Sequence, residues 1–373
     1  MWTGTDLCGI GENDRQAIYA TTIDLLTDDV LLEIFDHIRP DFEVRHVPVW
    51  KWHLLVHVCH RWRQIIFASP LRLDLRLLCT YETPVRKGLG FWPALPIVID
   101  YDGWRDFKFN GEDDVVAALE HPGRVRQLKL TVTSLLWRKM ATIMQEPFPA
   151  LTYLSISSMG RNVPTLPGGF LGGFAPCLRE IRLSGVPIPA LSTLLSSASD
   201  LVELVLLDIP QTGYISPAAL VACLAVLPRL DSLSIGFQSQ ASRADRIHPP
   251  PETQVVLPAL TSFSFEGECA YLEDFVAGID TPRLDSIDIT YSSQLDLQVP
   301  QLSEFISRSD LELSRFRHAE IYFDDSEMIS FRFCHEVDPE EFAIAIHISS
   351  CEGTNEEVWY MGQVLNQTSA YFT

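Results

Sequence analysis

Apolar residues near the N-terminus recur at helical spacing in two segments. In the first, TDDVLLEIFDHI, they lie three or four positions apart, which predicts one apolar stripe along an amphipathic helix. The stripe consists of Val30, Leu31, Ile34, Phe35 and Ile38. Thr27 is expected to cap this helix with its hydroxyl, and Pro40 is expected to end it. The second segment, WKWHLLVHVCHRWRQIIF, places along one face Leu54 or Leu55, Val58, Trp62 and Ile65 or Ile66.

The period then changes to strict alternation. Apolar and polar residues alternate over LRLDLRLL at 71–78 and again within WPALPIVIDY at 92–101, as in half-buried strands. Further along, a six-residue unit, apolar-x-x-apolar-x-apolar, recurs 23 to 32 residues apart. It starts at Val125, Leu151, Leu178, Leu201, Leu230, Leu260 and Leu284, with a weaker eighth copy at Phe316. Helix-like pieces such as ALSTLLSSA and YLEDFVAGI lie between the copies.

One strand and one helix in each copy is the period of a leucine-rich repeat, although the asparagine that usually follows the strand is missing. We therefore predict an α+β fold class, in which a small all-helical module precedes an irregular leucine-rich-repeat solenoid (an α/β horseshoe). The expected organisation is a flexible N-terminal tail at 1–20, the helical module at 21–70, linker strands and the start of the solenoid at 71–120, the solenoid at 121–325, and a divergent or incomplete C-terminal repeat region at 326–373.

Charge and composition narrow the choice of partner and compartment. The chain has 28 basic and 49 acidic residues and a net charge of −21, which repels nucleic-acid phosphates and anionic membranes. No apolar run approaches the roughly 20 residues that span a bilayer, and the first residues lack the features of a signal peptide. The eight cysteines include no CxxC pair, which indicates buried thiols in a reducing compartment. We expect a soluble cytoplasmic or nuclear protein that binds neither nucleic acid nor membrane.

Motifs for catalysis or metal binding are weak. His53 and His57 share a helix face at a spacing that can hold a metal, but no HExxH motif is present, and a solvated polar face explains the pair equally well. The glycine-rich GGFLGGF at 168–174 lacks the lysine and hydroxyl residue of a phosphate-binding loop. No nucleophile elbow or kinase signature set occurs. We expect no enzymatic activity, no cofactor and no metal.

The helical segments resemble an F-box. The family has a leucine-proline start, a first amphipathic helix and a valine-cysteine-x-x-tryptophan-arginine element. The matching positions here are Leu26-Thr27, 30–38, Val58-Cys59 and Trp62-Arg63, with Thr27 in place of the proline. The continuation, SPLRLDLRLLCTYETPVR and WPALPIVI, is similar to fungal mushroom-type F-box proteins, which join this module to irregular leucine-rich repeats.

This resemblance implies a role in the ubiquitin conjugation pathway. The F-box docks on a Skp-type adaptor, which joins it to a cullin-RING ligase in a Skp-cullin-F-box (SCF) complex. A module of about 45 residues cannot bury all of its large apolar side chains, so some are expected to contact that partner. The residues expected at the adaptor contact are Leu25, Leu26, Leu31, Ile34, Leu55, Val58, Cys59 and Trp62.

The repeat strands are expected to bind the target protein on their concave side. The candidate target-binding residues are Lys129, Tyr153, Arg182, Glu203, Val205, Leu207, Glu266 and Asp288. Val205 and Leu207 form an apolar patch, between a basic end at Lys129 and Arg182 and an acidic end at Asp288. We therefore expect a substrate-recognition adaptor of an SCF-type ubiquitin ligase. The alternative is a leucine-rich-repeat interaction scaffold whose degenerate F-box has no ligase role.

Overall fold

The computed structural model describes the chain over residue 23, 25–38, 52–80, 85–92, 94–102, 112–158, 165–187, 191–238, 254–292, 299–309, 311, 318–323, 328–334 and 344–349. The chain forms two compact units. The first consists of Met1–Leu77 and Phe91–Pro96, and the second of Leu78–Gly90 and Ile97–Thr373. The expected tail at 1–20 and the expected helix end at Pro40 lie outside the described residues.

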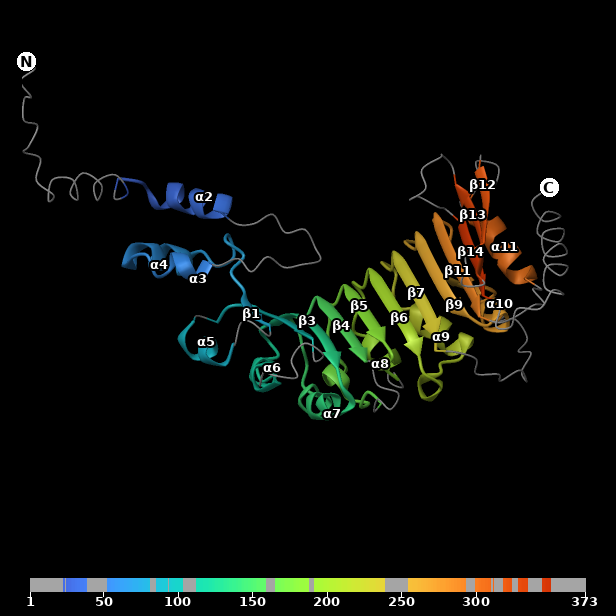
Figure 1. Cartoon of the computed structure of the whole chain (residues 1–373), viewed down its shortest axis with the longest axis horizontal. Coiled ribbons are helices and arrows are strands. Elements are labelled where there is room, and N and C mark those ends of the chain that lie inside the picture. The colour runs from blue at the N-terminus through green and yellow to red at the C-terminus, as the bar shows by residue number, and fades with distance from the viewer. Residues whose placement is uncertain are drawn as a thin grey trace, which may run out of the picture. The chain divides into compact units, whose positions relative to one another are not determined.

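Three helices make up the regular structure described between residues 28 and 68 of the first unit (Figure 1). They are α2 (Asp28–Ile38), α3 (Trp52–Leu55) and α4 (His60–Ala68). The expected cap of α2 is confirmed, because Thr27 Oγ1 accepts the Val30 N–H at 3.4 Å. The interior of the unit includes the buried residues Leu31, Leu32, Phe35, Trp52, Val56, Ile65 and Ile66.

The prediction of one continuous helix through residues 50–67 is wrong. After α3 the N–H groups of His57 and Val58 bond to the carbonyls of Leu54 and Leu55, which closes a turn. Cys59 then adopts an extended conformation and its Sγ accepts the Trp62 N–H at 3.5 Å, so α4 begins afresh at His60. The apolar spacing alone did not reveal this break, because the residues on both sides of it belong to the same core.

The second unit is built on a large sheet with the strand order β1-β2-β3-β4-β5-β6-β7-β9-β11-β14-β13-β12. The strands are β1 (Leu77–Cys79), β2 (Ile97–Asp102), β3 (Val125–Val132), β4 (Tyr153–Ser158), β5 (Glu180–Ser184), β6 (Glu203–Ile209), β7 (Ser232–Phe237), β9 (Ser262–Gly267), β11 (Ser286–Ser292), β12 (His318–Phe323), β13 (Met328–Cys334) and β14 (Ile344–Ser349). From β2 through β11 to β14 each strand pairs in parallel with the next, as expected for strands joined by helical crossovers. A small parallel pair is formed by β8 (Val255–Val256) and β10 (Ile279–Asp280).

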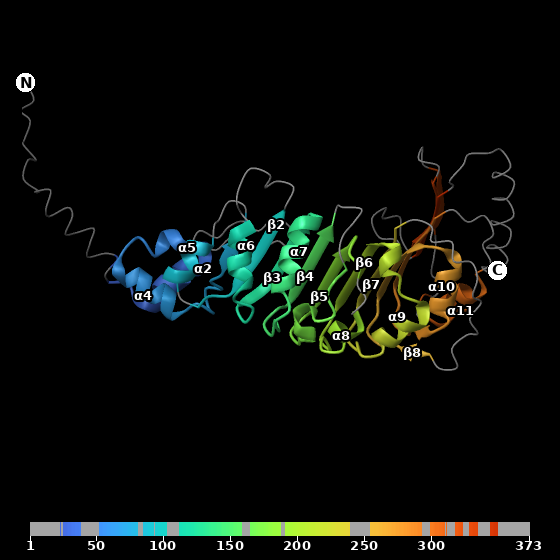
Figure 2. The same ribbon diagram turned by 90° about the horizontal axis from the view of Figure 1, so that it is seen from below.

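Helices lie along one face of this sheet (Figures 1 and 2). They are α5 (Arg86–Phe91), α6 (Glu112–Leu119), α7 (Ser134–Ile143), α8 (Leu191–Leu195), α9 (Pro217–Leu224), α10 (Cys269–Val276) and α11 (Pro300–Arg308), with short 3-10 turns η1 (Phe170–Gly173) and η2 (Gln211–Gly213). On β9, Phe263 faces the helix layer, since its ring lies 5.7 Å from that of Phe275 in α10 and 6.3 Å from that of Phe305 in α11. Side chains two residues apart on a strand share a face, so Phe265 faces the helices as well.

The core of the second unit is a set of apolar ladders that follow from the repeated sequence unit. Its second apolar position places one buried residue on each strand, in register with the next: Leu128, Leu154, Ile181, Leu204, Leu233, Phe263 and Ile287. The third apolar position supplies a parallel ladder of Leu130, Ile156, Leu183, Leu206, Ile235, Phe265 and Ile289. The seven strong copies of the unit therefore form strands as predicted.

The predicted fold class is wrong. The chain is α/β, with a parallel sheet and helices, and not an α+β chain in which a small all-helical module precedes a horseshoe solenoid. The strand-and-helix period is common to parallel sheets in general, and the asparagine that would support a regular repeat is absent here. The weaker eighth copy overlaps strand β12, but this strand does not continue the parallel array. It pairs antiparallel with β13 at the sheet edge, while β14 lies beside β11.

Candidate protein-interaction surfaces

The first unit presents large aliphatic side chains to solvent although its interior is filled. Val30, Ile34 and Ile38 are spaced four apart on α2 and are 44%, 41% and 54% exposed, so they form a stripe on the helix face turned away from the core. We call the exposed large aliphatic side chains between residues 23 and 58 the exposed apolar surface. It comprises Ile23, Leu25, Val30, Ile34, Ile38, Leu54 and Val58.

The predicted adaptor-binding residues divide between this surface and the core. Leu25, Ile34 and Val58 are exposed and accessible to a partner, whereas Leu26 and Leu55 are half-buried. Leu31, which was also predicted at the contact, is only 1% exposed. It follows Val30 in α2, so its side chain is turned about 100° away from the exposed stripe and faces the interior.

Cys59 and Trp62 also have structural roles. Cys59 is exposed and caps α4 through its sulfur. The half-buried Trp62 ring packs edge-on against Phe35 with 4.8 Å between the ring centroids, which joins α4 to α2. Trp62 therefore contributes to the core of the unit and presents only part of its ring to solvent.

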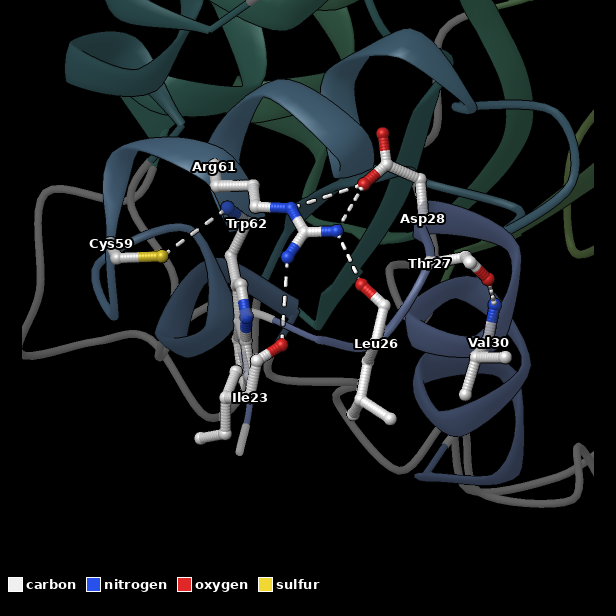
Figure 3. Close-up of polar contacts among 8 residues, drawn as sticks. All are labelled: Ile23, Leu26, Thr27, Asp28, Val30, Cys59, Arg61 and Trp62. Carbon is white, nitrogen blue, oxygen red and sulfur yellow. Dashed lines mark hydrogen bonds and ion pairs between the residues drawn. The ribbon is translucent and has the colours of Figure 1, made fainter. Parts of the chain in front are cut away.

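Arg61 holds the segment that precedes α2, and sequence reasoning missed it (Figure 3). Its Nε and Nη2 donate to Asp28 Oδ1 at 3.1 and 2.7 Å, Nη2 also donates to the carbonyl of Leu26, and Nη1 donates to the carbonyl of Ile23 at 3.5 Å. One guanidinium thus fixes the segment that displays Leu25. No local pattern indicates a contact between residues 33 positions apart, and the F-box resemblance singled out Arg63, whose Nε donates to the Val56 carbonyl at 3.0 Å.

The sheet of the second unit has a second face, which no helix described in the structure covers (Figures 1 and 2). We call it the open face. Its residues alternate with the buried ladders and are partly or fully exposed. They include every predicted target-binding residue, namely Lys129, Tyr153, Arg182, Glu203, Val205, Leu207, Glu266 and Asp288, together with Asp100, Asp102, Glu180, Ser232, Ser234, Ser262, Ser264 and His347.

The expected basic end of this face is not a basic surface. Lys129 Nζ lies 3.4 Å from Asp100 Oδ1, and Arg182 Nη2 lies 2.6 Å from Glu203 Oε1. These carboxylates neutralise both cations, and they come from neighbouring strands that the sequence alone did not bring together. At the other end, the Asp288 carboxylate lies 3.4 Å from His347 Nε2.

Glu180 and Glu203 share the neighbourhood of a single guanidinium. They are in register on β5 and β6, and Arg182 reaches across to Glu203. Burial raises the pKa of the Glu180 carboxyl above its ordinary value of 4.5, the Glu203 carboxylate raises it further, and Arg182 partly opposes this. This part of the open face therefore carries an excess of negative charge.

The predicted apolar patch lies beside these charges. Val205 is in register with Arg182 and is half-buried, and Leu207 is 36% exposed. Leu207 leans over Gly236 of β7, where an added Cβ would lie only 3.1 Å from Leu207 Cδ2 and 3.6 Å from the Cβ of Glu266. The patch is thus bordered by Glu203 and by Glu266.

No protein-family model matches this chain, and no curated protein shows detectable similarity to it. Within the residues that the structure describes, no group of three or more histidine, cysteine, aspartate or glutamate side chains is arranged to hold a metal ion. Among the described helices, none has both the length and the apolar character needed to cross a membrane.

Proposed function

We propose that this chain is a substrate-recognition adaptor of an SCF-type ubiquitin ligase. In this proposal α2 to α4 dock on a Skp-type adaptor, and the open face binds the protein to be ubiquitinated. The chain performs no covalent chemistry itself and supplies proximity between the ligase and its target.

The observation that carries the proposal is the exposed apolar surface on a unit whose core is already packed. Leu31, Leu32 and Phe35 occupy the inner side of α2, so Val30, Ile34 and the other exposed residues are not needed to fill the interior. Full burial of such a side chain contributes about 1.5–3 kcal/mol, and these are roughly half exposed, so each has about 1 kcal/mol to gain. Several together offset the loss of rotational and translational freedom on association.

The resemblance to the F-box supports the identity of the partner. The element Val58-Cys59 and Trp62-Arg63 follows the family pattern, and Thr27 provides a helix cap where the family has proline. Thr27 satisfies one of the free N–H groups in the first turn of α2, that of Val30, whereas proline would preset the backbone at that position. The substitution therefore preserves the start of the helix by another means.

A binding experiment with a purified Skp-type adaptor tests the proposal. The full chain is compared with an Ile34→Asp, Val58→Asp variant, which places two charges on the exposed apolar surface without touching the core. The matched control is Val256→Asp in the second unit, where the side chain is 55% exposed against 59% for Val58. We expect the wild type and the control to retain the adaptor and the double variant to lose it.

Circular dichroism shows whether each variant is folded. Failure of the folded wild type to bind any Skp-type adaptor would contradict the ligase role and favour an interaction scaffold. Equal retention by all three proteins would show that the adaptor docks elsewhere.

A further inference from the structure

The carboxylates of the open face outnumber its cations around the Val205–Leu207 patch. Arg182 is paired with Glu203, which leaves the neighbouring Glu180 carboxylate in excess on β5. On the other side of the patch, Glu266 extends from β9 next to Gly236. Two aliphatic side chains thus lie between two sites of negative charge.

The strand register gives the spacing of these features. Glu180 and Glu266 are separated by the strands β6 and β7, and by four residues along the strand direction. With strands about 4.8 Å apart and a rise of about 3.3 Å per residue, the two carboxylates lie roughly 19 Å apart on a diagonal. Val205 and Leu207 both belong to β6 and fall between the two carboxylates, Val205 near the diagonal and Leu207 to one side of it, where it leans over Gly236 of β7.

An extended polypeptide covers this distance in about six residues, and its side chains at positions i, i+2, i+4 and i+6 point to the same side. Cations at i and i+6 would then meet Glu180 and Glu266, and aliphatic side chains at i+2 and i+4 would cover Val205 and Leu207. Serines at 232, 234, 262 and 264 leave the surrounding face free of bulky side chains.

We propose that the open face binds an extended segment of the target with lysine or arginine at i and i+6 and aliphatic residues at i+2 and i+4. This inference rests on the proposed role of the open face in target selection and names the chemistry of the target. The excess of carboxylates makes a basic protein segment the complementary occupant and disfavours acidic segments.

Selection of short random peptides on the immobilised full chain tests this proposal. We expect selected peptides to be enriched in the i, i+2, i+4, i+6 pattern over peptides of equal composition in another order. A synthetic copy of a selected peptide is then titrated against wild type, a Glu180→Gln, Glu266→Gln variant, and Glu304→Gln as the matched control. Glu304 is an exposed carboxylate on α11, in the helix layer of the same unit.

The double variant should bind the peptide about three- to tenfold more weakly, the scale of two partly exposed ion pairs, while the control should bind as wild type does. Raising the salt from about 0.05 to about 0.5 M should weaken wild-type binding and have less effect on the double variant. Selection of no peptide, of acidic peptides, or of peptides that bind the double variant equally well would overturn the inference. Adaptor binding by the same preparations tests the ligase role separately, since it depends on the first unit.

Discussion

Replacement of Arg61 by alanine should destabilise the start of α2 far more than loss of an ordinary surface ion pair. The side chains of Arg61 and Asp28 are 34% and 64% exposed, so their ion pair contributes only about 0.5 kcal/mol. The bonds from the charged guanidinium to the carbonyls of Leu26 and Ile23 add about 1.5 kcal/mol. We therefore expect Arg61→Ala to cost about 2 kcal/mol in local unfolding free energy.

Amide hydrogen exchange over residues 28–38 measures this directly. A loss of about 2 kcal/mol corresponds to about 30-fold faster exchange in α2. Arg72→Ala is the matched control, because Arg72 Nη2 donates to Glu33 Oε2 of the same helix at 3.0 Å and the two side chains are 44% and 62% exposed, close to those of Arg61 and Asp28. We expect about twofold faster exchange or less for the control. Equal effects of the two substitutions would refute the idea that the carbonyl contacts of Arg61 hold the segment.

Three further predictions follow from other contacts. Phe263→Ala should lower the free energy of unfolding in urea by about 3–5 kcal/mol, because the buried ring packs on Phe275 and Phe305. Ser264→Ala on the open face should change it by less than about 0.5 kcal/mol, and similar losses for the two variants would contradict the assignment of the two faces. The pKa of Glu180 is raised in the folded state, so folding takes up a proton just above pH 4.5 and the contribution of Glu180 to stability grows as the pH falls through that window. Glu180→Gln should therefore flatten the pH dependence of urea unfolding there, and an unchanged slope would contradict the raised pKa. Burial raises the pKa of Cys79 to about 12, with a smaller contribution from Asp114. Iodoacetamide at pH 8 should therefore label the exposed Cys59 and Cys177 in the native protein and leave Cys79 unmodified, as measured by mass spectrometry. Rapid labelling of Cys79 would contradict its burial.

The positions of the repeat strands could be predicted because their signal is local, whereas the strand expected over 71–78 forms only from Leu77, as β1. The unit at 125, 151, 178, 201, 230, 260 and 284 places its second and third apolar residues on one side of a strand, and those residues form the buried ladders. The fold class could not be predicted in the same way. A strand-helix period fixes the succession of elements but not the architecture into which they assemble, and the last strands reverse direction through pairings that no repeat pattern contains.

The candidate surfaces were only partly predictable for a related reason. Helix α2 carries apolar side chains around much of its circumference, so spacing alone did not distinguish the buried Leu31 from the exposed Ile34. On the sheet, alternation placed Val205 and Leu207 on the open face, where Val205 is half-buried and Leu207 is 36% exposed. The pairing of Arg182 with Glu203 depends on strand register, and the contacts of Arg61 depend on tertiary folding, so neither has a local signal in the sequence.

Docking of α2 to α4 on a Skp-type adaptor can be mapped on the native protein by amide hydrogen exchange of the full chain, with and without saturating purified adaptor. We expect slower exchange over residues 28–38 and 52–66 and no change over β9 and β11. Unchanged exchange in the first unit, or protection confined to the sheet, would contradict it.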